Sequence, residues 1–185
     1  MYGVINKSLR EMMLGQYGEA AWERVLKRSG VSSDSFLTMC SYDDSVTYQL
    51  AHAAAEELNI NLSDALKAFG VHWVEHTLAT NYETLARAAG GDMLEFLANL
   101  NGLHDRISST FIDYQPPEFE VANHGEDLVS VLYISTREGL TPFVEGLLIG
   151  LSRRFNQDID IVSIEPLPVE LGEKTLFTCR LGSPR

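Results

Sequence analysis

The sequence has only two cysteines, Cys40 and Cys179, and they lie far apart. Because they do not form a CxxC spacing, they argue against a structural metal site and are typical of a protein from a reducing compartment. The sequence also lacks an apolar run long enough to span a bilayer and an N-terminal signal-peptide pattern. These absences predict a cytoplasmic protein that does not bind to membranes.

Basic residues are scarce, with 14 Lys and Arg against 26 Asp and Glu, which gives a formal net charge of −12. This balance argues against nucleic acid or an anionic membrane as the main partner. Any site for an anion must therefore be local. The sequence has no phosphate-binding loop and no Ser/His/Asp arrangement. His72 and His76 lie four apart on a predicted helix, but no third metal ligand lies nearby in the sequence, so a metal site there is disfavoured.

The order of the predicted elements indicates an α+β fold. Helical periodicity covers residues 2–14, 19–28, 45–58, 64–79 and 92–112. After Gln115-Pro116-Pro117 the pattern changes to strands over 118–122, 128–135, 159–165 and 175–181, with one apolar helix over 139–155. We expect one domain of residues 1–185. It should contain a helical subdomain, 1–62, packed on an α/β subdomain of antiparallel sheet plus helices, 63–185.

Three polar side chains follow one another on the predicted strand over 128–135 and just beyond it. Tyr133, Ser135 and Arg137 are two residues apart, so on a continuous strand they share a face at intervals of about 7 Å. Arg binds a carboxylate through two hydrogen bonds, and the hydroxyls add donors. The three residues therefore suit a ligand with two carboxylates. A surface-exposed strand face is the more common alternative for such a pattern.

His104 falls on the apolar face of the predicted helix over 92–112, one turn after Leu100. A packed core histidine is the more common explanation for such a position. The functional alternative is an axial ligand, because haem iron needs a neutral imidazole that faces an apolar pocket. One inward histidine and a dicarboxylate clamp together describe haem, which has an iron and two propionates.

At these residues the chain resembles the H-NOX (haem-nitric oxide/oxygen binding) family, which includes the haem domain of the soluble guanylate cyclase β subunit. The Tyr-x-Ser-x-Arg motif at 133–137 is the family's propionate-binding signature, and the family's proximal histidine corresponds to His104. Further matches in the same order are Met1-Tyr2-Gly3, Asn6, Tyr42-Asp43-Asp44-Ser45, Thr47-Tyr48, Phe69-Gly70, Glu95-Phe96-Leu97, Pro117 and Glu138-Gly139-Leu140. The resemblance extends from residue 1 to about residue 180.

The resemblance implies haem b between the two subdomains, with NO, and also CO, as ligands of its iron. His104 would be the axial ligand of the iron, and Tyr133, Ser135 and Arg137 would bind the propionates. Pro117 matches a family proline that presses on the haem, and Asp44 is expected to pair with Arg137. Binding of NO should weaken the bond between the iron and His104 and let the two subdomains relax relative to each other.

The distal residues implied by the resemblance are mostly apolar. Some family members stabilise O2 with a distal Tyr. Alignment on Gly146 places Phe143 at that position, and a shift of one residue places Pro142 there. The remaining distal positions are Ile5, Leu9, Trp73 and Leu147. Without a hydroxyl donor the site should discriminate against O2, unless the indole N–H of Trp73 donates. Packing of Trp73 with Leu66 and Phe69 is the more common alternative.

We therefore expect a ferrous haem sensor of NO that is not itself an enzyme. The chain carries no effector domain up to Arg185, so its output is expected to act in trans. By resemblance the partner is a histidine kinase or a diguanylate cyclase/phosphodiesterase. One alternative is a haem sensor that binds O2. A second is a haem enzyme with a distal acid or base such as His72 or His76, and a third is a haem-free interaction module.

Overall fold

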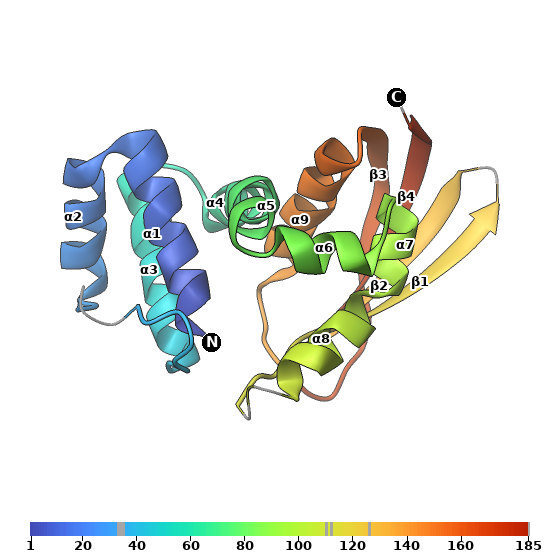
Figure 1. Ribbon diagram of the computed structural model, residues 1–185. Helices are drawn as coiled ribbons and strands as arrows, with labels where there is room; N and C mark the ends of the chain where they lie inside the picture. Colours follow the sequence, from blue (N-terminus) through green and yellow to red (C-terminus); the bar gives the residue numbers. More distant parts are fainter. Residues whose placement is uncertain (33–35, 110, 112, 126, 185) are drawn as a thin grey trace.

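A computed structural model describes residues 1–32, 36–109, 111, 113–125 and 127–184 (Figure 1). The predicted α+β fold is confirmed: helices make up the N-terminal half and an antiparallel sheet follows. The helices are α1 (Gly3–Tyr17), α2 (Glu19–Ser29), α3 (Asp44–Glu57), α4 (Leu62–His72), η2 (Trp73–Leu78), α5 (Ala79–Asn81), α6 (Glu83–Ala89), α7 (Met93–Ala98), α8 (Leu100–Ser108) and α9 (Thr141–Arg154). The strands are β1 (Glu118–Gly125), β2 (Leu128–Ser135), β3 (Gln157–Pro166) and β4 (Glu173–Pro184).

Short polar side chains fix where several helices begin. The carboxylate of Asp43 accepts a hydrogen bond from the backbone N–H of Ser45 at 2.8 Å and caps α3. The side chain of Asn61 accepts from the N–H of Asp64 at 2.8 Å and caps α4. Ser63, the residue just before the predicted start of this helix at residue 64, lies inside the helix. Helix α4 therefore begins two residues earlier than the sequence pattern indicated.

The helix that follows Asn61 changes its winding in the middle. It is α-helical over Leu62–His72, π-helical over Trp73–Leu78 and α-helical again over Ala79–Asn81. A π segment inserted in an α-helix is rare and occurs frequently at functional sites. The π segment changes the direction in which the side chains after Trp73 point, compared with a regular α-helix.

The helix predicted over 92–112 is two helices, α7 and α8, that meet at Asn99. The side-chain amide of Asn99 donates to the carbonyl of Ala89 at 2.8 Å, and this bond holds the junction against the end of α6. Residues 110 and 112 of the predicted span lie outside the described residues. The break does not change the face on which His104 lies, because Leu100, Leu103 and Ile107 still pack against the core.

The sheet has the strand order β1-β2-β4-β3, and each neighbouring pair is antiparallel. Burial alternates along β2, with Val129, Val131, Tyr133 and Ser135 on the buried face. This is the period of two expected for a strand with one face on the core. Tyr133 lies opposite Phe119 of β1 and Thr175 of β4. The end of β2 is therefore in the interior of the sheet, where its side chains are held from both sides.

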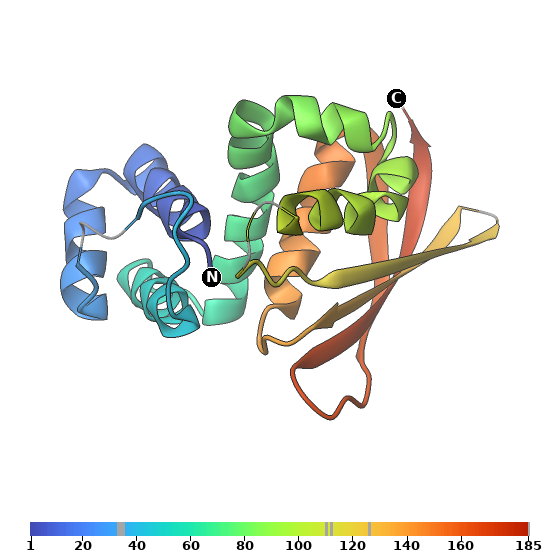
Figure 2. The same cartoon turned by 60° about the horizontal axis from the view of Figure 1, so that its bottom comes forward.

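Two separate hydrophobic cores lie on either side of α4. The first contains buried residues of α1, α2 and α3 together with Phe69 of α4. The second runs from Val74 to Leu181 and joins α6–α9 to the sheet. Figure 2 shows α4 and its continuation standing between the N-terminal helices and α9. Trp73, at the start of the π segment, packs against both cores and is therefore at the junction of the two regions.

Helices α4 and α9 approach each other closely because glycine lies at their contact. A Cβ atom on Gly70 would collide with the backbone of Phe143 and Leu147, and one on Gly146 would collide with the carbonyl of Lys67. Without side chains at these positions the two helix backbones can touch. Among the described residues, no helix combines the length and the apolar character needed to cross a bilayer.

Candidate functional site

The residues that the sequence singled out meet at one cavity of about 460 Å³ between the two regions. Its volume is within the range of about 300–1,000 Å³ that is usual for sites of small molecules and cofactors. All ten predicted site residues line it: Ile5, Leu9, Trp73, His104, Pro117, Tyr133, Ser135, Arg137, Phe143 and Leu147. Most of the remaining lining side chains are aliphatic or aromatic. Residues far apart in the sequence thus form a single, mainly apolar pocket.

Tyr133 and Ser135 reach the cavity from the buried face of β2, with 1% and 7% of their surfaces exposed. Arg137 lies two residues beyond the end of the strand, in a bend, so Tyr133, Ser135 and Arg137 are not all on one continuous strand. The hydroxyl oxygen of Ser135 accepts a hydrogen bond from the backbone N–H of Arg137 at 3.0 Å. This bond turns the chain so that Arg137 also lines the cavity. Burial raises the pKa of Tyr133 to about 12, so its phenol remains a donor.

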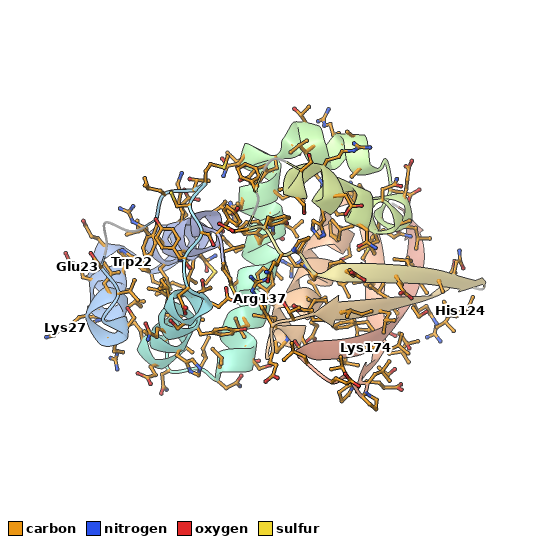
Figure 3. The ribbon with its side chains drawn as sticks, turned by 90° about the horizontal axis from the view of Figure 1, so that it is seen from below. Trp22, Glu23, Lys27, His124, Arg137 and Lys174 are labelled. Carbon is orange, nitrogen blue, oxygen red and sulfur yellow. The ribbon has the colours of Figure 1, made fainter. Side chains whose placement is uncertain are left out.

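The guanidinium of Arg137 joins the two regions of the protein. Its Nε donates to the Oδ2 atom of Asp44 on α3 at 2.7 Å, and its Nη1 donates to the carbonyl of Gln115 at 2.7 Å. Figure 3 places Arg137 at the centre of the molecule, between the N-terminal helices and the sheet. Burial alone would raise the pKa of Asp44. Hydrogen bonds from the N-terminal amino group and from Arg137 outweigh that effect and hold it below its ordinary value.

The ring of His104 is fixed by the segment that precedes β1. Its Nδ1 lies 3.1 Å from the carbonyl oxygen of Pro117. A carbonyl can only accept, so Nδ1 carries the proton and Nε2 keeps a free lone pair. Burial lowers the pKa of His104, which favours the neutral ring. A neutral imidazole whose other nitrogen is held by a carbonyl is the usual arrangement of a metal-binding histidine.

Asn101 holds the His104 helix against the sheet, and sequence reasoning missed it. Its side-chain amide donates to the carbonyl of Phe119 at 2.7 Å, and its side-chain oxygen accepts from the N–H of the same residue at 2.9 Å. The two bonds replace a strand partner at the start of β1. Asn101 lies three residues before His104 on α8, a spacing that places both on similar sides of the helix and was the available signal.

The side of the cavity formed by η2 and α9 is apolar at the predicted positions. Trp73 and Phe143 enter it from facing helices, and the rings of Phe69 and Phe143 are 5.2 Å apart between centroids. Of the two alignments left open by the sequence, the one that selects Phe143 places a residue in the cavity. Pro142 is not among the lining residues of the described chain.

Besides those of Tyr133 and Ser135, further hydroxyls line the cavity, on Tyr2, Thr38, Thr47, Tyr82 and Tyr114. The hydroxyl of Thr47 already donates to the side chain of Asn6 at 2.6 Å. The ring of Tyr114 packs edge-on against that of His104 at 6.1 Å, which places it on the histidine side. Burial raises the pKa of Tyr114 to about 12 and also raises that of Tyr82. No sequence pattern indicates Tyr82 and Tyr114, because separate segments of the fold bring them to the cavity.

The donor set of the cavity fits haem. A mainly apolar space suits the porphyrin, a single neutral imidazole suits an axial ligand, and the Tyr, Ser and Arg side chains at the end of β2 suit propionates. The other histidines lie elsewhere. His72 and His76 face a separate cavity, His52 is exposed on α3, and His124 bonds Ser130 at 2.8 Å near the tip of the β1–β2 hairpin (Figure 3).

Comparisons with known proteins agree with this donor set. A model of the haem-NO-binding family matches residues 2–163. The soluble guanylate cyclases gcy-37 and gcy-32 of Caenorhabditis elegans are each 28% identical to the chain, over 169 and 166 residues. These stretches cover 89% and 88% of the chain but only 24% of each cyclase, so the chain spans about a quarter of the length of these relatives.

Solved structures show the same fold at lower sequence identity. A mutant H-NOX protein from S. oneidensis in the Fe(II) ligation state superposes with a TM-score of 0.87 at 20% identity, covering 100% of this chain and 98% of that one. The S. oneidensis protein in the Fe(II)NO state gives a TM-score of 0.80 at 19% identity, covering 99% and 100%. With a family match over most of its residues and this fold, the chain belongs to the haem-NO-binding (H-NOX) family of haem-based gas-sensing domains.

Proposed function

We propose that this protein binds haem b in the cavity and acts as a ferrous sensor of NO that discriminates against O2. One arrangement carries the proposal. His104 faces the cavity with a free Nε2, while the predicted distal residues on the other elements offer no hydroxyl. His104 would hold the iron, and Tyr133, Ser135 and Arg137 would hold the propionates. When bound, the haem supplies a ferrous iron that can take up NO or CO.

Selectivity for NO follows from the absence of a well-placed donor among the predicted distal residues. Stable O2 binding to ferrous haem depends on hydrogen-bond donors in the distal pocket, whereas NO depends on them much less. Ile5, Leu9, Phe143 and Leu147 have no side-chain donor. The indole N–H of Trp73 and lining hydroxyls such as that of Tyr82 keep O2 binding open as the alternative function.

The polar contacts between the two regions support a change of shape as the output. Arg137 pairs with Asp44, and the hydroxyl of Tyr48 donates to the carbonyl of Glu138 at 2.8 Å. Both contacts join α3 to the segment just after β2, beside the propionate-binding side chains. We propose that the helical part, residues 1–62, and the α/β part, residues 63–185, are two subdomains. These contacts would couple events at the cavity to their relative position.

The relatives suggest which kind of protein receives this signal. They are soluble guanylate cyclases, and the region they share with this chain is about a quarter of their length. We propose that this chain regulates a cyclase-type or kinase-type signalling enzyme, a histidine kinase or a diguanylate cyclase/phosphodiesterase. Measuring the activity of such an enzyme with the haem-loaded protein, with and without NO, tests this part separately.

Absorption spectroscopy tests the central proposal. The purified protein, reconstituted with haem and reduced without oxygen, is exposed first to air and then to NO. We expect a reduced-haem Soret band that air leaves unchanged and NO shifts. A stable O2 spectrum would replace NO selectivity with O2 sensing, and Trp73→Phe and Tyr82→Phe would then identify the donor. A failure to take up haem would contradict the proposal as a whole.

A further inference from the structure

A second cavity, of about 390 Å³, lies between α1 and the helix that runs from α4 through the π segment to α5. It shares no lining residue with the haem cavity in the part of the chain that the structure describes. Its lining is polar at several positions, with Glu11 and Gln16 from α1 and His72, His76, Thr80 and Asn81 from the opposite helix. The two histidines are among those that the proposed haem function leaves unused.

His72 has no hydrogen-bond partner among the described residues. Its side chain is buried, with 7% of the residue exposed, and neither Nδ1 nor Nε2 is bonded within the described chain. Buried polar atoms are nearly always paired, so an imidazole in this state indicates a bound water or ion. Burial, and next the neighbouring His76, lower the pKa of His72 to about 4. The ring is therefore neutral at pH 7, with a lone pair that an ion can use.

The second histidine lies beside the first, four residues further along the helix. The rings of His72 and His76 are stacked, with centroids 4.5 Å apart and planes inclined by 27°. Two histidines at i and i+4 on one helix face can bind one metal ion together. Imidazole nitrogen is a ligand that Zn²⁺, Cu²⁺ and Ni²⁺ prefer.

The third group comes from the other side of the cavity, which the sequence could not indicate. Glu11 lines the same space, and its carboxylate forms an exposed ion pair with Lys7 at 3.7 Å. Such surface pairs contribute little stability, so Glu11 can turn toward the histidines at small cost. Among the described residues, no three His, Cys, Asp or Glu side chains already converge as a metal site. Glu11 must therefore change rotamer when an ion binds.

We propose that His72, His76 and Glu11 bind a divalent transition-metal ion, of which Zn²⁺ is the best suited, between α1 and the π segment. The ion joins the N-terminal helices to the helix that carries Trp73. It lies in the interface where Ser8 of α1 and Thr77 of the π segment share a hydrogen bond of 2.5 Å. Bound metal would therefore restrain movement of one region against the other. The site itself does not depend on NO or on the proposed sensing function.

Calorimetric titration with Zn²⁺ tests the site, using the full haem-loaded protein after removal of metal with a chelator and with no NO present. We expect one ion per chain. His76→Gln, which alters an exposed side chain, and His72→Gln should each weaken binding by more than about tenfold. Glu11→Gln should weaken it less. His52→Gln is the matched control, because His52 is exposed on α3 and should leave binding unchanged.

The outcomes separate a metal site from a water-filled cavity. Absence of saturable binding, or equal binding in the wild type and in both His72→Gln and His76→Gln, overturns the proposal. Loss in the histidine variants with no effect of Glu11→Gln overturns the link to α1. A second readout guards against misfolding of the His72 variant. Zn²⁺ should raise the melting temperature of the wild type by mass action but not that of His76→Gln. Neither result bears on whether the haem binds NO.

Discussion

The two sides of the haem cavity are held in place by different forces. On the His104 side, hydrogen bonds position the chain. His104 is bonded to the carbonyl of Pro117, and Asn101 forms two hydrogen bonds with the backbone of Phe119. Arg137 donates to Asp44. On the other side, α9 packs against α4, and the side chains of η2 and α9 that line the cavity are mainly apolar. Glycines lie at the contact between α4 and α9. Under the proposed function, cofactor binding would depend on directional bonds, whereas ligand selectivity would depend on the exclusion of donors by packing.

The difference also determines how each side should respond to mutation. A directional bond acts through one atom, so losing it removes a defined interaction. A packed contact acts through shape, so adding or removing one carbon changes the separation of two helices. Substitutions on the His104 side should therefore affect haem retention most. Substitutions on the α9 side should affect stability and the choice of gas.

The largest effect is expected for His104→Gly, which removes the proposed iron ligand. The variant should fail to hold haem through the iron, and added imidazole should restore the attachment by filling the space that the side chain leaves. Haem content and the Soret spectrum measure this. His124→Gly is the matched control, since His124 lies at the β1–β2 hairpin away from the cavity. Unchanged haem loading and spectrum in His104→Gly would rule out the axial assignment.

Arg137→Ala should weaken haem retention by the next largest amount. Charge-assisted hydrogen bonds are worth about 1.5–3 kcal/mol each, and the change removes those to a propionate and the tie to Asp44. Arg137→Lys keeps the charge without the planar fork and should be intermediate. Transfer of haem to apomyoglobin gives the rate of loss. Arg153→Ala, an exposed ion-pair residue on α9, is the control. Equal rates in Arg137→Ala and Arg153→Ala would argue against the clamp.

Gly70→Ala should destabilise the protein by about 1–3 kcal/mol, because its Cβ would collide with the backbone of Phe143 and push α4 away from α9. Gly102→Ala is the matched control on α8. A Cβ there meets no other atom within 4 Å, so the change should stabilise the helix by about 0.5–1 kcal/mol. Urea unfolding gives both values. The same sign of effect in the two variants would contradict the close approach of α4 and α9.

Sequence reasoning found the cavity residues that belong to a local pattern and missed those that depend on how separate segments meet. The Tyr-x-Ser-x-Arg spacing and the inward His104 are local patterns, so the order of residues along the chain is enough to reveal them. The strand over 128–135 was predicted with its observed bounds, because burial alternates cleanly along it. The positions of Tyr82 and Tyr114 depend on segments that meet only in the folded protein. The same is true of the two hydrogen bonds between Asn101 and Phe119. No periodicity in the local sequence indicates contacts between such distant segments.

The errors in the helices have local physical causes. The pattern over 92–112 continues through Asn99 because the apolar spacing is undisturbed there, yet the side chain of Asn99 bonds Ala89 and ends α7. Helix α4 begins after Asn61 rather than at residue 64. Asn61 and Ser63 are both residue types that cap helices well, so the sequence alone does not rank them. The π segment also has no sequence signature. It alters which residues after Trp73 share a face; Leu78 lines the cavity, whereas Thr77 does not.

The smallest structural change, Phe143→Tyr, tests the difference between the two sides of the cavity most directly. Phe143→Tyr adds one hydroxyl to the packed side, where the ring of Phe143 lies in the cavity against Phe69. We expect little change in stability, below about 1 kcal/mol, because the volume is nearly conserved. If selectivity rests on the missing donor, the variant should gain an O2 spectrum in air while it still binds NO.

Phe155→Tyr provides the matched control, because Phe155 packs against Phe96 at 5.9 Å and does not line the cavity. It should leave the spectrum in air unchanged. A Phe143→Tyr protein that retains haem but ignores O2 would mean that a hydroxyl at this position is not directed at the ligand. Selectivity would then have to arise from the side that holds His104. This outcome would contradict the proposal that one side binds the cofactor and the other sets the selectivity for the gas.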